Sequence, residues 1–229
     1  MSNFFYTTGI IVITIVVYLL ARKMYFKWKT PLLLPVAVST VMIIVLLELF
    51  QLSYETYMLG GKWIMELLGP AVVALAYPLY HHRETLKQLF LPIIAGAFVG
   101  SFIGIVSGVG LAILANIDHA LISSLGPKSV TTPVAMDLAI ATGGIQSLAA
   151  VFVMIAGIGG TMMSTTVFKY GKVNHPVGRG LGIGSASHAI GTSRALENNE
   201  FEGSISTIAM ILCAFFLSIM LPPIIAWWL

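Results

Sequence analysis

The sequence predicts an all-α, polytopic integral membrane protein with about six full spans and two broken or re-entrant hairpin segments. Hydrophobic residues make up 58% of the 229 positions and charged residues only 9%. A soluble domain carries roughly 25% charged residues, so this chain cannot build a solvated surface. Apolar runs recur at close to the ~20-residue length that crosses a bilayer as a helix. We therefore expect a single transmembrane domain over residues 1–229.

The N-terminal half, residues 1–115, is expected to hold four spans, at residues 4–20, 32–52, 63–80 and 89–115, with Pro31 opening the second. Basic residues follow the first and third spans. Because Lys and Arg collect on the cytoplasmic side, the N-terminus is expected outside. Glycine recurs at every fourth position of the fourth span, which favours close helix packing. The first basic cluster is Arg22, Lys23, Lys27 and Lys29, and the glycines are Gly96, Gly100, Gly104 and Gly108.

The C-terminal half is expected to contain two units, each a broken hairpin followed by a span. They cover residues 116–168 and 174–229. The basic residues after the 145–168 span are best placed in the cytoplasm, which makes the two broken segments hairpins that enter from opposite sides of the membrane. The alternative is that both segments cross fully as unwound helices. Either arrangement leaves the C-terminus outside.

A weak internal similarity suggests that the two units form an inverted repeat. Leu125-Gly126 and Leu181-Gly182 each open a break, and Gly144 and Gly203 each close a polar segment before a span. Two such units facing opposite ways match the inverted-repeat architecture of secondary transporters. Chance similarity between glycine-rich membrane segments is the alternative.

The two hairpins carry the residues expected to bind substrate. Broken helices place half-helix N-termini inside the membrane, where N–H groups and the helix dipole attract an anion. Hydroxyls and cations beside these breaks suit a small carboxylate. The expected substrate-binding residues are Lys128, Ser129, Thr131 and Thr132 in the first hairpin, and Ser185, Ser187, His188, Thr192 and Arg194 in the second. Gly182, Gly184 and Gly191 let the backbone approach a ligand or, alternatively, another helix.

Several of these residues have a structural alternative. Lys128 is either a site cation or a lysine that snorkels to the outer interface. Arg194 either clamps a carboxylate or forms a surface salt bridge with Glu197. His188 either titrates or serves as a hydrogen-bonded structural histidine. Asp137, an acid within an apolar stretch, is the candidate coupling-ion residue or a structural partner of Lys128.

Other classes of function are not expected. The chain has no HExxH or GxSxG motif, and Asp137 has no second intramembrane acid to pair with, so an enzyme is not expected. No cofactor is expected, and no metal site, because His81-His82 borders a loop. The single cysteine, Cys213, cannot form an internal disulfide. Nothing suggests nucleic-acid binding.

Three blocks of sequence resemble a known family. Residues 59–84 read LGGKWIMELLGPAVVALAYPLYHHRE, residues 125–144 read LGPKSVTTPVAMDLAIATGG, and residues 180–197 read GLGIGSASHAIGTSRALE. These blocks are similar to the signatures of the LrgB/CidB family, and the resemblance runs over nearly the whole chain. It implies a multi-pass protein of the bacterial cell membrane. Members are described as holin/antiholin-like, tied to murein hydrolase control and programmed cell death, beside a smaller LrgA/CidA-type partner.

The resemblance also implies a transport function. Plastid relatives act as glycolate/glycerate translocators, and bacterial pairs are linked to pyruvate uptake or release. We therefore expect a secondary transporter or channel for small monocarboxylates of the pyruvate, lactate or glycolate type. The alternative is a non-transporting regulator that acts through the LrgA/CidA-type partner. The expected partners are the small carboxylate, the lipid bilayer, that small membrane protein and further copies of this chain.

Overall fold

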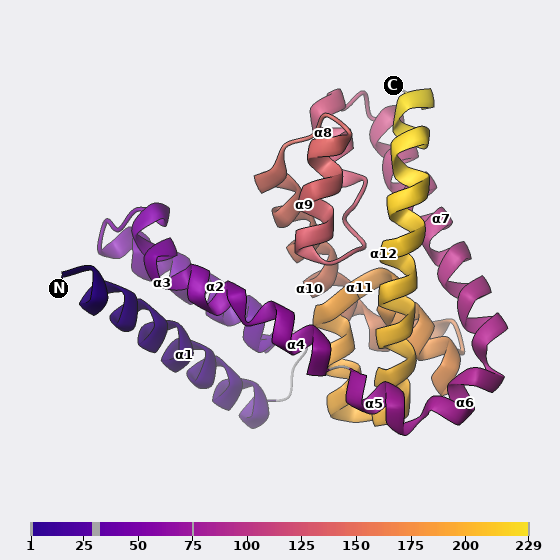
Figure 1. The fold of residues 1–229 in the computed structure, drawn as a ribbon, viewed down its shortest axis with the longest axis horizontal. Coiled ribbons are helices and arrows are strands. Elements are labelled where there is room, and N and C mark those ends of the chain that lie inside the picture. The colour runs from indigo at the N-terminus through magenta and orange to yellow at the C-terminus, as the bar shows by residue number, and fades with distance from the viewer. Residues whose placement is uncertain (1, 29–32, 75, 229) are drawn as a thin grey trace. The chain divides into compact units, whose positions relative to one another are not determined.

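The computed structural model describes residues 2–28, 33–74 and 76–228, and every regular element within these ranges is an α-helix (Figure 1). The prediction of an all-α protein is therefore confirmed. Lys29 of the first basic cluster and Pro31, predicted to open the second span, lie outside the described residues. The chain divides into two compact units, Met1–Ala76 and Tyr77–Leu229.

The first unit is built on a long N-terminal helix. Helix α1 (Ser2–Trp28) packs against α2 (Pro35–Leu49) and α3 (Tyr54–Glu66). The Tyr57 hydroxyl of α3 lies 3.3 Å from Thr14 Oγ1 of α1. Gly60 allows this close approach, since a Cβ there would lie 2.8 Å from Ile10 Cβ. A hydroxyl contact and close packing of Gly60 against Ile10 thus join α1 to α3.

The predicted third span, residues 63–80, is divided among three helices. Helix α3 ends at Glu66, and α4 (Leu68–Ala74) and α5 (Ala76–His81) follow. In a continuous helix the ring of Pro70 would clash with the carbonyl of Glu66, four residues earlier, so the helix ends there. The segment is apolar enough for a span, but proline prevents one uninterrupted helix.

The second unit contains the other long helices. After α6 (Arg83–Gln88) come α7 (Phe90–Leu114), α8 (His119–Leu125), α9 (Thr132–Ala141), α10 (Gln146–Tyr170), α11 (Pro176–Asn198) and α12 (Glu200–Trp228). Within the described residues, α1, α7, α10 and α12 are the four helices long and apolar enough to cross a membrane. Helix α2 has 15 residues, roughly 22 Å at 1.5 Å per residue. The count of six spans therefore stays a prediction.

Helices α8 and α9 with their flanking residues, residues 119–145, form what we call the first hairpin. Helix α8 ends at Leu125, and the chain turns through Gly126-Pro127 before α9 begins. The Ile145 N–H, just past α9, donates to Ser124 Oγ of α8 at 2.7 Å. This hairpin packs near the C-terminal end of α12, where a Cβ on Gly126 would lie 2.8 Å from a Leu221 methyl group. Figure 1 shows α8 and α9 at that end of the second unit.

Helix α11 is the second hairpin, because its backbone breaks at His188 (φ 38°, ψ −134°) and the chain doubles back. Arg179 Nε, near its start, lies 3.1 Å from Glu202 Oε2, just past its end. Both ends of α11 therefore lie beside the first turn of α12. The second hairpin occupies the end of the unit opposite to the first (Figure 1).

The predicted place of the second break is wrong. Leu181 and Gly182 lie within the first helical arm, and the break comes at His188. A Cβ on Gly182 would lie 3.1 Å from the Phe168 ring of α10, so this glycine serves helix packing. The proposed sequence echo with Leu125-Gly126 is lost at this point, and the inverted repeat stays a prediction.

Two apolar clusters hold the second unit together. The larger joins α7, α8, α9, α10 and α12, and the smaller joins the α6–α7 corner to α11 and α12. Ile105, Val153 and Leu221 are fully buried in the larger one, and Ile205 is fully buried in the smaller one. Each hairpin is thereby fixed against the long helices by its own group of apolar side chains.

Candidate functional site

The tip of the first hairpin rests on α7. A Cβ on Gly104 would lie 3.6 Å from Ser129 Oγ, and a Cβ on Gly108 would collide with the Lys128 ammonium. Lys128 Nζ donates to the Gly104 carbonyl at 3.3 Å. Glycine at position 108 therefore leaves room for the lysine head group to reach the α7 backbone.

The first arm of the second hairpin rests on the same face of α7, one to two turns away. A Cβ on Gly96 would lie 2.8 Å from a Leu181 methyl group, and a Cβ on Gly100 would lie 2.9 Å from Ser185 Cβ. Ser185 Oγ donates to the carbonyl of Leu181 within its own arm. The predicted close packing along this face, which we call the glycine stripe (Gly96, Gly100, Gly104 and Gly108), is confirmed. Its partners are the two hairpins.

A cavity of about 390 Å³ opens beside Lys128. Its walls are mostly apolar, and Lys128 is its charged lining residue. The lysine is half-buried and makes no ion pair within the described ranges. An ammonium on an apolar wall attracts an anion more strongly than it would in water. The lining residues are Ser107, Gly108, Leu111, Ala112, Ile117, Leu125 and Lys128.

The tip of the second hairpin is buried against α10. His188 is 2% exposed, and its Nε2 donates to the Val153 carbonyl at 2.9 Å. Gly157 makes space for the imidazole, since a Cβ there would lie 2.6 Å from its Nε2. Ser187 Oγ lies against Gly160 of α10. His188 is thus buried and hydrogen-bonded, as its structural alternative predicts, and its role in binding substrate stays a prediction.

Three further predicted residues of the second hairpin lie at contacts between helices: Thr192, Gly184 and Gly191. Thr192 Oγ1 lies 2.8 Å from Ser206 Oγ of α12. Gly184 lies against the Ser206 carbonyl, and a Cβ on Gly191 would lie 2.7 Å from Ile183 Cγ2 of the opposite arm. Gly184 and Gly191 therefore let helices approach each other, and a role for them beside a ligand stays a prediction.

Arg194 and Asp137 lie away from the glycine stripe. Arg194 Nη1 is 3.7 Å from Glu197 Oε2 at the base of the second hairpin, as the salt-bridge alternative predicts. Asp137 is exposed on α9, and among the described residues no ion pair joins it to Lys128. Thr131 and Thr132 are half-buried at the start of α9, next to the first hairpin's tip.

The ion pair of Arg179 with the buried Glu202 was not predicted from the sequence. The Glu202 side chain is only 7% exposed and the Arg179 side chain is 41% exposed. The Arg179 guanidinium also lies over the Phe168 ring, 5.5 Å from its centroid. In the sequence Glu202 reads as the end of a polar run. The one available signal is that it also begins the long apolar run that forms α12.

Comparison with known proteins gives the same family over nearly the whole chain. The profile of the LrgB-like family matches residues 14–227. A Bacillus subtilis (strain 168) protein described as uncharacterized protein YxaC is 45% identical over 218 residues, 95% of this chain and 94% of that protein. A Staphylococcus aureus (strain Mu50) protein described as holin-like protein CidB is 33% identical over 226 residues, 98% of each chain. No solved structure matches the chain.

Proposed function

The chain belongs to the LrgB-like family, and from this premise we propose that it is a secondary transporter or channel for small monocarboxylates. Its apolar helices and its holin-like relatives identify it as a multi-pass membrane protein. The substrates proposed are of the pyruvate, lactate or glycolate type. We propose that these acids cross a bacterial cell membrane unchanged, without enzymatic conversion. Both termini of the chain are proposed to lie outside the cell.

The observation that carries the proposal is the convergence of two hairpins on one face of α7. The hairpins lie at opposite ends of the second unit (Figure 1). Their side chains reach the same glycine stripe, with Lys128 and Ser129 at Gly104 and Gly108, and Ser185 at Gly100. A pathway through the membrane needs polar groups deep between its two sides, and irregular backbone is tolerated at that depth only inside protein or beside a cavity.

The chemistry at this convergence suits a small carboxylate. The Lys128 ammonium can form a charge-assisted hydrogen bond to a carboxylate oxygen, and such bonds are roughly twice as strong as neutral ones. Ser129 lies next to Lys128 at the same tip and supplies a hydroxyl. The cavity of about 390 Å³ beside Lys128 exceeds the size of a three-carbon acid. A protein that only opened lesions with simple apolar helices would need none of these groups.

The test is uptake of labelled pyruvate, lactate and glycolate into liposomes that contain the purified protein, with and without the small LrgA/CidA-type partner. Lys128→Met keeps the length of the side chain but removes its charge, and we expect uptake to fall at least tenfold. Gly110→Ala is the matched control, because its Cβ would lie 3.8 Å from the Trp228 ring, an ordinary contact. The proposal would be contradicted if folded wild-type protein took up none of these acids under either condition. Full uptake by Lys128→Met would also contradict it.

A second candidate function is control of murein hydrolases and cell death through an LrgA/CidA-type partner. It is favoured by the relatives described as holin-like protein CidB. In this case the packing face of α7, the glycine stripe, matters more for function than the charge of Lys128. Lys128→Met would then retain activity in an autolysis assay, while bulky substitutions in the glycine stripe would abolish it.

A further inference from the structure

A histidine-rich cluster lies in the second unit, outside the proposed carboxylate site. It consists of His81 at the end of α5, His82 before α6, and Glu200 at the start of α12. One nitrogen from each histidine and one carboxylate oxygen lie within 4.8 Å of one another. Neighbouring side chains on one helix do not face each other. Here the bend between α5 and α6 lets two consecutive imidazoles meet, with their ring centroids 4.9 Å apart.

The buried Nε2 nitrogen of His82 lacks a hydrogen-bond partner among the described residues. Its Nε2 is shielded from solvent and makes no hydrogen bond within the described part of the chain. The ring is held in place by Phe201, whose centroid lies 5.4 Å away at 70°. Leaving such a group unpaired costs roughly 1–3 kcal/mol, a cost that a bound ligand would offset.

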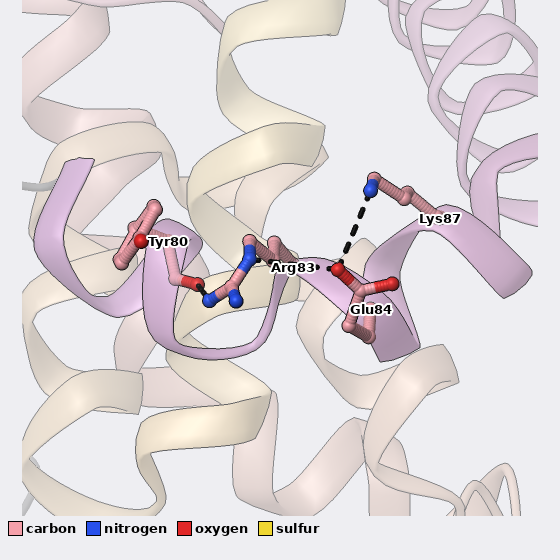
Figure 2. Close-up of polar contacts among 4 residues, drawn as sticks. All are labelled: Tyr80, Arg83, Glu84 and Lys87. Atoms are coloured by element: carbon pink, nitrogen blue, oxygen red, sulfur yellow. Dashed lines mark hydrogen bonds and ion pairs between the residues drawn. The ribbon is translucent and has the colours of Figure 1, made fainter.

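The cations near the cluster form ion pairs with Glu84 and not with Glu200. Glu84 Oε1 pairs with both nearby cations, at 3.5 Å from Arg83 Nε and 3.3 Å from Lys87 Nζ, as Figure 2 shows. Arg83 also lies over the Tyr80 ring, 4.4 Å from its centroid. Glu200 makes no ion pair in the ranges that the structure describes. Its carboxylate therefore lies near the two imidazoles, with no competing ion pair among the described residues.

From these contacts we propose that His81, His82 and Glu200 bind a divalent transition-metal ion of the Zn²⁺ class. Two imidazole nitrogens and one carboxylate oxygen form a zinc ligand set that leaves a position for water. Ligand atoms around tetrahedral zinc lie about 3.4 Å apart at bond lengths of 2.0–2.2 Å, so the cluster closes on the ion by small side-chain rotations. The sequence alone did not indicate this site, because Glu200 is distant from His81-His82 along the chain.

The ion would fasten the α5–α6 segment to the base of the second hairpin. Glu200 lies two residues from Glu202, whose carboxylate holds Arg179 of α11. The first turn of α12 would then bind α11 through one acid and the α5–α6 bend through the other. Metal binding would therefore stabilise the end of the unit at which the second hairpin opens.

Calorimetric titration of the full-length protein in detergent, purified without a polyhistidine tag, tests the site with zinc chloride alone. We expect one zinc ion per chain, and at least tenfold weaker binding in His82→Ala and in Glu200→Gln, which keeps the shape of the side chain. His119→Ala is the matched control, because His119 lies on α8 and its nearest polar partner is Ser123. Cobalt(II) substitution should give a tetrahedral visible spectrum that Glu200→Gln loses.

The outcome is independent of transport, since neither measurement involves a transported carboxylate substrate. Absence of stoichiometric zinc binding would overturn the proposal. So would wild-type affinity in both His82→Ala and Glu200→Gln, or an equal loss in His119→Ala.

Discussion

At the residue scale, the backbone of His188 is the most unusual feature of the second hairpin. Its φ of 38° lies in the region that favours glycine, and yet the residue is a histidine. Such a conformation costs about 1–3 kcal/mol and persists only where the surroundings enforce it. Here the enforcing contacts are the hydrogen bond to the Val153 carbonyl and the fit of the ring against Gly157.

This strain predicts an unusual order of stabilities. His188→Gly and His188→Ala both lose the hydrogen bond, but only glycine relieves the backbone, so His188→Gly should be the more stable by about 1–2 kcal/mol. At the helical position Ile190, the same pair of substitutions should follow the reverse order, with alanine favoured by about 1 kcal/mol. Thermal unfolding in detergent measures both pairs. Equal stability of the two His188 variants would show that the backbone there is unstrained.

At the element scale, α7 acts as a shared support. Its buried face consists of small and β-branched residues at helical spacing, while Phe98 and Phe102 are exposed on the other side, as suits contact with lipid. The glycine stripe lets both hairpins approach the α7 backbone. Small residues on this kind of surface allow the van der Waals packing that drives helix association in a membrane.

The stripe predicts a graded response to alanine. Gly100→Ala places a methyl group 2.9 Å from Ser185 Cβ, an atom that cannot move without its helix, and should destabilise the protein by about 1–3 kcal/mol. Gly104→Ala meets Ser129 Oγ at 3.6 Å, an ordinary contact, and should leave stability unchanged or raise it by up to about 1 kcal/mol, the gain of alanine over glycine within a helix. Thermal unfolding and proteolysis of the two variants check this. A larger loss in Gly104→Ala than in Gly100→Ala would contradict the packing described.

At the scale of the whole molecule, the segments that connect the long helices of the second unit lie at defined ends of those helices. The end of α7 and the start of α10 are linked by the first hairpin. This hairpin leaves on the side it enters, since Gly143, just past α9, lies beside His119 at the start of α8. The turn after α10, with Lys172, lies at the other end of α10. If α7 and α10 span the bilayer, Asn116 and Lys172 lie on opposite faces of it.

Cysteine labelling in intact cells tests that arrangement. In a Cys213→Ala background, which removes the single native cysteine, cysteines at Asn116 and at Lys172 should react with a membrane-impermeant reagent from opposite sides. The positive-inside rule further predicts that Lys172 is cytoplasmic. Both positions labelling from the same side would mean that the first hairpin crosses the membrane. The comparison holds whichever way the protein is oriented.

Much of this architecture was predictable from hydropathy and from helix breakers. The helices α1, α7, α10 and α12 were visible as long apolar runs, and Gly126-Pro127 marked the turn of the first hairpin. Lys128, Ser129 and Ser185 were named as site residues from residue type alone, and they lie along one face of α7. Their role in binding substrate stays a prediction.

What could not be predicted depends on contacts between distant residues. The break in α11 was expected at a glycine, but Gly180 and Gly184 are needed where α11 meets α12, and a histidine held by Val153 takes the turn. The pairing of Arg179 with Glu202 arises only because the chain reverses between them. Local propensity carries no record of such partners, since tertiary contacts override it.

The second hairpin also has a consequence for the order of assembly. Its contacts with α12, such as Thr192 with Ser206 and Arg179 with Glu202, join residues that are close along the chain. The entropy lost on closing a loop grows with its length, so these contacts form at little cost. Those that bring α12 to α7, such as Cys213 with the Ala97 carbonyl, close a far longer loop. We expect α11 and the first half of α12 to form one local folding nucleus that later docks onto α7.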